Sequence, residues 1–220
     1  MSSSILHASE TSAAADSSAG ESESGYGLAG LVERLKRMGG PPAFEGLSAL
    51  LGGAEVTAEE LRPYVSFKEG TYARHRVHLG EHAELLVLCW RPGQRTPIHD
   101  HAGSYGAVSV LRGVMWETLF EMDDAAGLRY KSSREWTPGH VTGADVPDIH
   151  QLGNPDVSGQ DLVTLHLYAP PLTSLNVYKV GRRESTSTLW MNSWNPTIWG
   201  PPRGPAAFRD SLRLRLLPRS

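Results

Sequence analysis

The chain has 220 residues, a length that suits one domain with terminal extensions. Hydrophobic residues make up 40% of the sequence and charged residues 20%, which is ordinary for a soluble globular protein with a core. The net charge is −3, so no basic field favours nucleic acid or an anionic membrane as a partner.

The sequence contains one cysteine, Cys89, which excludes an internal disulfide and a zinc ribbon. Cys89 lies in the apolar run 85–90, so we expect a buried thiol in a reducing compartment. No apolar run approaches the roughly 18 residues of a membrane-spanning helix, and the start of the chain shows no secretory signal. We therefore expect a cytoplasmic protein with no membrane partner.

Changes in composition along the chain predict four segments. Residues 1–25 are rich in serine and alanine and poor in bulky apolar side chains, so we expect a disordered tail. Residues 26–66 carry helical patterns, and residues 67–193 carry strand patterns. Residues 194–220, rich in proline and arginine, are expected to form a C-terminal tail.

Short helices are predicted within residues 26–66. In the first, apolar residues recur at helical spacing, and the Gly-Gly-Pro-Pro sequence at 39–42 ends it. A second apolar cluster covers 44–51, and Thr57 and Glu60 have the spacing of a capping box that opens a third helix. We expect these helices to pack on the domain that follows.

From about residue 70 the pattern changes to short strands separated by glycine, proline and aspartate. No helical pattern of useful length interrupts them, so an antiparallel all-β barrel or sandwich is favoured over parallel βαβ winding. The predicted strands cover 71–79, 84–90, 107–112, 114–121, 128–135, 141–142, 161–168, 175–180 and 188–192.

Three histidines form a candidate metal site. His99 and His101 are two residues apart on an extended segment, so their side chains point to the same face. His150 begins another extended segment and is the third ligand that we expect, with His140 as the alternative. Imidazole ligands suit iron, zinc, copper or nickel, so the spacing does not choose the metal.

The glycine spacing around these histidines resembles the two cupin motifs. Gly93 and Gly113 flank the first pair, and Gly139 and Asn154 flank His150. Cupins usually add a glutamate a few residues after the first pair, and Gly106 occupies that place here. Without a carboxylate ligand the full charge of a divalent ion is available to bind and ionise an anionic ligand. Three coordination positions stay open for a bidentate substrate and O₂.

Four segments together resemble the thiol dioxygenases, specifically the cysteine dioxygenase family. The segments are LCW at 88–90, PIHDH at 97–101, ETLF at 117–120 and TLHLYAPP at 164–171. The likeness covers about residues 70–180. It implies a cupin barrel with one non-haem Fe(II) held by His99, His101 and His150. It also implies the oxidation of L-cysteine by O₂ to cysteine sulfinic acid.

The resemblance also implies roles for five further residues. Tyr72 and Arg74 match the family's Tyr-x-Arg element, whose arginine binds the substrate carboxylate through its planar guanidinium. Thr164, His166 and Tyr168 alternate on one strand and therefore face one side. The family places this trio behind the metal ligands with the tyrosine hydroxyl toward the iron, so His166 and Tyr168 are the expected catalytic residues.

Two departures from the family bear on the site. Animal members carry a cysteine that is crosslinked to the active-site tyrosine, whereas this chain has Gly106 there, so the crosslink cannot form. Leu175 is apolar where some relatives have cysteine or arginine, which leaves the substrate open. Ala169-Pro170 matches an X-Pro pair of the family, and we expect a cis bond there.

Three functions compete at this point. Arg74 favours cysteine as the substrate, since relatives that prefer 3-mercaptopropionate typically have glutamine at this position. Oxidation of 3-mercaptopropionate or another small thiol is the near alternative. A non-catalytic metal-binding cupin sensor is opposed by the complete histidine set. We expect a monomer whose partners are a small thiol and O₂.

Overall fold

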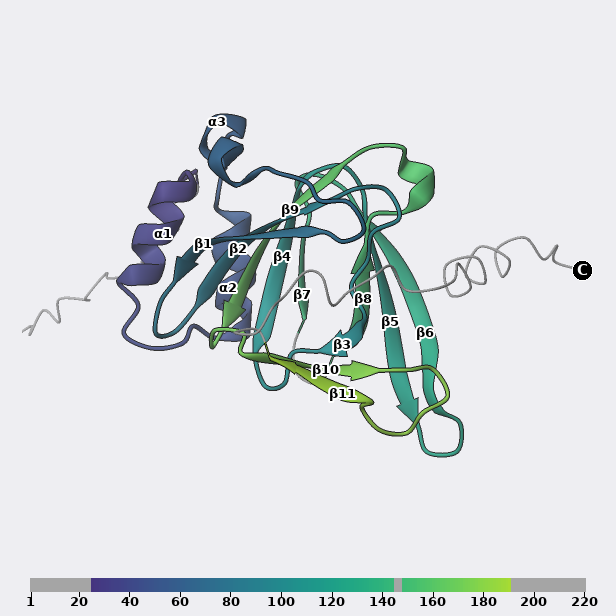
Figure 1. The fold of residues 1–220 in the computed structure, drawn as a ribbon. Helices are drawn as coiled ribbons and strands as arrows, with labels where there is room; N and C mark the ends of the chain where they lie inside the picture. The colour runs from purple at the N-terminus through teal and green to yellow at the C-terminus, as the bar shows by residue number, and fades with distance from the viewer. Residues whose placement is uncertain (1–24, 145–147, 191–220) are drawn as a thin grey trace, which may run out of the picture.

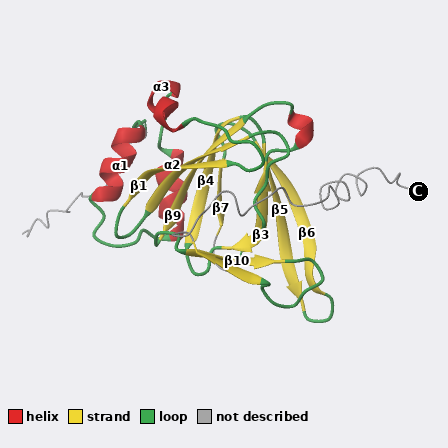
Figure 2. Ribbon diagram, viewed as in Figure 1, coloured by secondary structure: helices red, strands yellow, loops and turns green. Residues whose placement is uncertain are grey.

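The computed structural model describes residues 25–144 and 148–190. Two antiparallel sheets pack face to face, and the helices α1, α2 and α3 lie together on one side of the molecule (Figures 1 and 2). The predicted antiparallel all-β class is therefore confirmed. The expected tails fall outside the described residues, apart from Gly25.

The described helices all precede the strands, except for one short turn. They are α1 (Leu28–Lys36), α2 (Phe44–Gly52), α3 (Ala58–Leu61), η1 (Arg62–Tyr64) and η2 (Asp156–Ser158). The predicted capping box is present, because Thr57 Oγ1 accepts the Glu60 N–H at 3.3 Å and the Glu60 carboxylate accepts the Thr57 N–H at 2.9 Å. The other carboxylate oxygen of Glu60 accepts the Leu28 N–H at 2.9 Å. Glu60 thus joins the starts of two helices. None of the described helices is long and apolar enough to cross a membrane.

The first sheet has five strands and the second has six. The first runs β1 (Ala73–Leu79), β2 (Glu84–Trp90), β9 (Leu162–Ala169), β4 (Tyr105–Arg112) and β7 (Val141–Ala144). The second runs β11 (Ser187–Trp190), β10 (Ser174–Tyr178), β3 (Ile98–Asp100), β8 (Ile149–Gly153), β5 (Met115–Asp123) and β6 (Gly127–Trp136).

Most predicted strands are found with bounds that differ by a few residues. Strands β3 and β8 were expected only as extended segments, because each is short and carries too little alternation to stand out. Their strand character comes from pairing with each other and with their neighbours in the second sheet. The last two residues of the predicted strand 188–192 lie outside the described residues.

Strand β2 is buried on both faces of the first sheet. On one face, Leu85, Val87 and Cys89 pack with the leucines of α1 and α2. On the other face, Leu86 and Leu88 join the core between the two sheets. Cys89 Sγ lies 3.6 Å from the carbonyl oxygen of Tyr64, and burial raises the pKa of the Cys89 thiol. Two-sided burial explains why the strand reads as an uninterrupted apolar run.

We expect Glu60→Ala to lower the free energy of unfolding by about 1–2 kcal/mol, because helix starts lose carboxylate acceptors at two places. Chemical denaturation measures this change. Glu59→Ala is the matched control, since the ion pair of Glu59 with Arg62 is exposed on both side chains. Equal losses in the two variants would contradict the bridging role of Glu60.

Candidate metal centre

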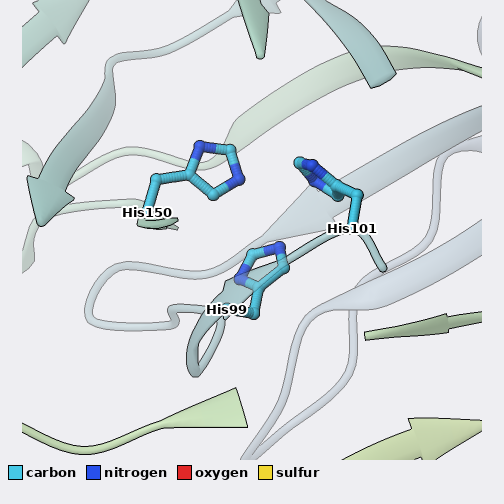
Figure 3. Close-up of side chains that lie close together, drawn as sticks. All are labelled: His99, His101 and His150. Atoms are coloured by element: carbon cyan, nitrogen blue, oxygen red, sulfur yellow. The ribbon is translucent and has the colours of Figure 1, made fainter. Parts of the chain in front are cut away.

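The two strands β3 and β8 bring His99, His101 and His150 together. His99 lies directly opposite His150 in the antiparallel pairing, and His101 follows two residues later. The ring centroids lie 5.1 Å apart for His99 and His101, 4.8 Å for His99 and His150, and 5.0 Å for His101 and His150. One ligand nitrogen from each ring lies within 4.8 Å of the other two. The three rings face a common point (Figure 3).

Hydrogen bonds indicate which nitrogens face that point. His99 Nδ1 donates to the carbonyl oxygen of Pro97 at 3.0 Å, and His150 Nδ1 donates to Glu117 Oε1 at 3.1 Å. Among the described residues, Nε2 of His101 and Nε2 of His150 are buried and have no hydrogen-bond partner. Buried polar atoms without partners are unfavourable unless something binds them. The donor set therefore fits a metal ion.

The surroundings keep the imidazoles of His99 and His101 neutral. Burial lowers the pKa of His99 to about 3, and the neighbouring charges of His150 and Arg74 act in the same direction. Burial also holds the pKa of His101 well below its usual range. A metal ligand must offer an unprotonated nitrogen, so both rings are ready to bind a cation at neutral pH.

Glu117 on β5 supports the site from behind His150. Its side chain is 3% exposed and also accepts the indole N–H of Trp136 at 2.9 Å and the hydroxyl of Thr142 at 3.4 Å. Burial works to raise the pKa of Glu117, but the hydrogen bonds and the charge of His150 outweigh it and lower that pKa. Asp148 lies 3.6 Å from the same Nδ1 atom. Both carboxylates are on the Nδ1 side of His150, away from the other two rings.

Glu117 is a functional residue to which no role was predicted from the sequence. The signal it offered was an acidic residue two positions after the buried Met115 on an alternating strand, at a position that points inward. The alternative ligand His140 is exposed, bonds with Thr137 and is not in the described metal-binding group.

Asp100, the last residue of β3, lies between His99 and His101 and anchors the start of the turn that follows. Its carboxylate accepts the Tyr178 hydroxyl at 2.5 Å, the Asn176 side-chain N–H at 3.0 Å and the Ala102 N–H at 2.8 Å. Ala102 has a φ of 49°, which is uncommon for a residue with a side chain. Asp100 therefore fixes β3 to β10 and holds the chain where it leaves the site.

The trio predicted on β9 forms a connected network. Trp90 Nε1 donates to Thr164 Oγ1 at 3.0 Å, Thr164 Oγ1 lies 2.8 Å from His166 Nε2, and His166 Nδ1 lies 3.1 Å from the Tyr168 hydroxyl. The Tyr168 and His101 ring centroids are 5.2 Å apart. The network therefore runs from the core to the side of the three-histidine group.

Tyr72 and Arg74 lie on the same side of the first sheet as this network. Tyr72 stacks on Trp90 with centroids 4.1 Å apart, and burial raises its pKa to about 12. Arg74 has a side chain that is 14% exposed. Burial is the main influence on the pKa values of His166 and Tyr168, and the charge of Arg74 acts on both as well. The structure thus gathers all the predicted site residues around one region.

Gly106 explains how Tyr168 fits without a crosslink. The two residues are opposite each other in the pairing of β4 with β9. A Cβ atom at position 106 would lie 2.7 Å from Cδ1 and 2.8 Å from Cε1 of Tyr168, closer than real contacts allow. The tyrosine ring therefore occupies the space of the missing side chain. The expected cis bond between Ala169 and Pro170 is present.

Two antiparallel sheets that enclose three histidines define a cupin-type metalloprotein. A sequence model of the family described as cysteine dioxygenase type I matches residues 43–181. The chain is 29% identical to cysteine dioxygenase type 1 of Rattus norvegicus over 157 residues, which cover 69% of this chain and 78% of that protein. The Homo sapiens protein of the same name is 28% identical over the same lengths.

A solved structure of an uncharacterized conserved protein with a double-stranded β-helix domain, from Klebsiella pneumoniae, matches with a TM-score of 0.43 and 17% identity. The match covers 54% of this chain and 94% of that one. On the sequence matches, the chain belongs to the cysteine dioxygenase family. It is accordingly an oxidoreductase of the dioxygenase class, and enzymes of this family use non-haem iron.

We expect Glu117→Gln to weaken iron binding by about 10- to 100-fold, because the amide cannot match the carboxylate as an acceptor for His150 Nδ1. Titration of the metal-free protein with Fe(II) under anaerobic conditions measures the affinity. Glu135→Gln is the control, since Glu135 also accepts an indole N–H, from Trp116, but is exposed. An unchanged affinity in Glu117→Gln would show that the carboxylate does not support the site.

Proposed function

We propose that the protein is an Fe(II)-dependent thiol dioxygenase that oxidises L-cysteine with O₂ to cysteine sulfinic acid. The observation that carries this proposal is a buried group of three histidines, with no carboxylate among its members, beside Arg74 and Tyr168. Both oxygen atoms become bonded to sulfur, and the hydrogen of the thiol is retained in the acid. The reaction therefore balances without an external reductant.

His99, His101 and His150 would hold the metal through their Nε2 atoms. A ferrous ion held by three neutral ligands supplies a site that lowers the pKa of a bound thiol and binds O₂. The protein's part is to keep the three rings oriented, which the acceptors Pro97 and Glu117 do through His99 and His150. Burial of the rings also excludes water from this region.

Arg74 would bind the substrate carboxylate. A guanidinium presents two parallel N–H groups that match the two oxygens of a carboxylate. The backbone of β1 holds this side chain on the inner face of the first sheet, where it is largely shielded from water. Positioning the carboxylate in this way would place the sulfur of a short thiol next to the three histidines.

Tyr168 would place its hydroxyl next to the reacting groups. The Trp90 indole only donates, so it can start a chain of donors in which Thr164 donates to His166 and His166 donates to Tyr168. The tyrosine hydrogen would then be directed at the substrate or O₂. Burial raises the pKa of Tyr168 far above neutrality, so the hydroxyl keeps its proton.

The near alternative is 3-mercaptopropionate, which offers Arg74 the same carboxylate but lacks the amine of cysteine. Leu175 is buried in the same cluster as Tyr72 and Tyr168, so this part of the interior is apolar and favours neither thiol by charge. A cytoplasmic location and a monomeric state belong to the proposal as well. The buried Cys89, with no second cysteine in the chain, supports a reducing compartment.

The test is oxygen uptake by anaerobically iron-loaded protein, with metal content and sulfinate product measured on the same preparation. We expect one O₂ consumed per sulfinate and a higher kcat/KM for L-cysteine than for 3-mercaptopropionate. The opposite ranking would replace cysteine with 3-mercaptopropionate. Iron-bound protein that consumes no O₂ with either thiol, or with cysteamine, would favour the sensor.

We expect Arg74→Ala to raise KM for L-cysteine by at least about tenfold, because the charge-assisted pair with the carboxylate is lost. Cysteamine has no carboxylate, so its KM should change little. Steady-state oxygen uptake with both thiols measures the difference. Equal losses for the two substrates would show that Arg74 has a structural role.

A further inference from the structure

Glu84, the first residue of β2, is a buried carboxylate that neither the family resemblance nor the proposed reaction uses. Its side chain is only 1% exposed, and its oxygens lie 2.9 Å from Arg76 Nε and 3.5 Å from a terminal nitrogen of Arg74. A carboxylate buried without positive partners would be strongly unfavourable. The two arginines therefore supply the positive partners that this buried side chain requires.

All three charged side chains lie on the face of the first sheet that meets the second sheet. Residues directly opposite each other in antiparallel strands point to the same face. The registers pair Arg74 with Leu88, Arg76 with Leu86, and Glu84 with Tyr168. Leu86, Leu88 and Tyr168 all belong to the core between the sheets. Glu84 thus sits on the inner face, next to the tyrosine beside the metal centre.

The charges in this group do not cancel. Arginine stays protonated at any physiological pH, so Arg74 and Arg76 contribute two positive charges and Glu84 contributes one negative charge. The group keeps one net positive charge near Tyr168. Half of the Arg76 side chain is exposed, whereas Arg74 is mostly buried, so the inner charge is that of Arg74. One net positive charge complements one carboxylate.

We infer that Glu84 and Arg76 are specificity-determining residues that match the site to thiols with a single carboxylate and disfavour thiols with two. This inference rests on the proposed function, in which Arg74 receives the substrate carboxylate. Glu84 repels a second carboxylate. It lies 3.5 Å from Arg74 but only 2.9 Å from Arg76, so its closer ion pair is with Arg76. Arg76 therefore compensates most of the negative charge of Glu84, so that Glu84 neutralises less of the positive charge of Arg74.

A pair of thiols that differ by one carboxylate tests the inference. Mercaptosuccinate is 3-mercaptopropionate with a second carboxylate on the carbon that bears sulfur. Dissociation constants for both are measured by calorimetry on iron-loaded protein without O₂, so that no turnover is needed. In Glu84→Gln, which keeps the side-chain shape, we expect the ratio of the two constants to shift at least about tenfold toward mercaptosuccinate, because one negative charge has been removed.

Two further variants separate charge from shape. Arg76→Met removes a positive charge, so the ratio should move the other way, toward 3-mercaptopropionate. Glu84→Gln combined with Arg76→Met restores one net positive charge and should return the ratio to within about threefold of the original. If Glu84→Gln does not fold, the Arg76→Met variant decides the question by the direction of its shift.

The matched control is Asp161→Asn. Asp161 also contacts two arginines, Arg91 at 3.1 Å and Arg112 at 3.6 Å, but it precedes Leu162, which pairs with Trp90 at the far end of β2 from Glu84. In Asp161→Asn the ratio of the dissociation constants of the two thiols should stay unchanged. An unchanged ratio in folded Glu84→Gln, or a double variant that does not recover, would overturn the inference. Thiols that bind but are not oxidised by the original protein would instead overturn the proposed function.

Discussion

His99 and His150 face each other across the single paired position of β3 and β8, and the metal centre depends on that register. A slip of one residue in either strand would turn that strand's histidine to the opposite face and separate the rings. The register is held from outside the pair. Asp100 ties β3 to β10, and Glu117 on the neighbouring β5 holds the ring of His150. A three-residue strand alone would not fix such a geometry.

Charged side chains lie on both sides of the three histidines. Behind His150, a buried carboxylate compensates part of the charge that a metal ion would bring, although the ligand set itself contains no acid. On the opposite sheet, two arginines and one carboxylate leave a positive charge where the proposed substrate would place its own acid group. The site therefore separates the groups that orient the metal from those that select the ligand.

The sequence was sufficient for the class of fold and for the three histidines that the structure brings together, and less so for the residues that support them. The shared face of His99 and His101 follows from the alternation of side chains along a strand, and β2 was predictable as a continuous apolar run because both of its faces are buried. His150 was preferred to His140 because it begins an extended segment and is followed by Asn154 at cupin-like spacing, and the structure shows that His150 is buried whereas His140 is exposed. Glu117 and Glu84 were missed because their partners are 33 residues away in one case and lie on a neighbouring strand in the other. Single acidic residues in strands give no sign of such pairing.

The placement of Cys89 has a consequence for an enzyme that acts on sulfur. Cys89, whose thiol is the only one in the sequence, lies in the first sheet, and its side chain points into the layer between that sheet and the helices. The three histidines lie on the opposite side, between the two sheets. The first sheet therefore separates the Cys89 thiol from the candidate metal centre, where O₂ would bind. This separation follows from the alternation of side chains along a single strand, β2, which turns Cys89 away from the three histidines.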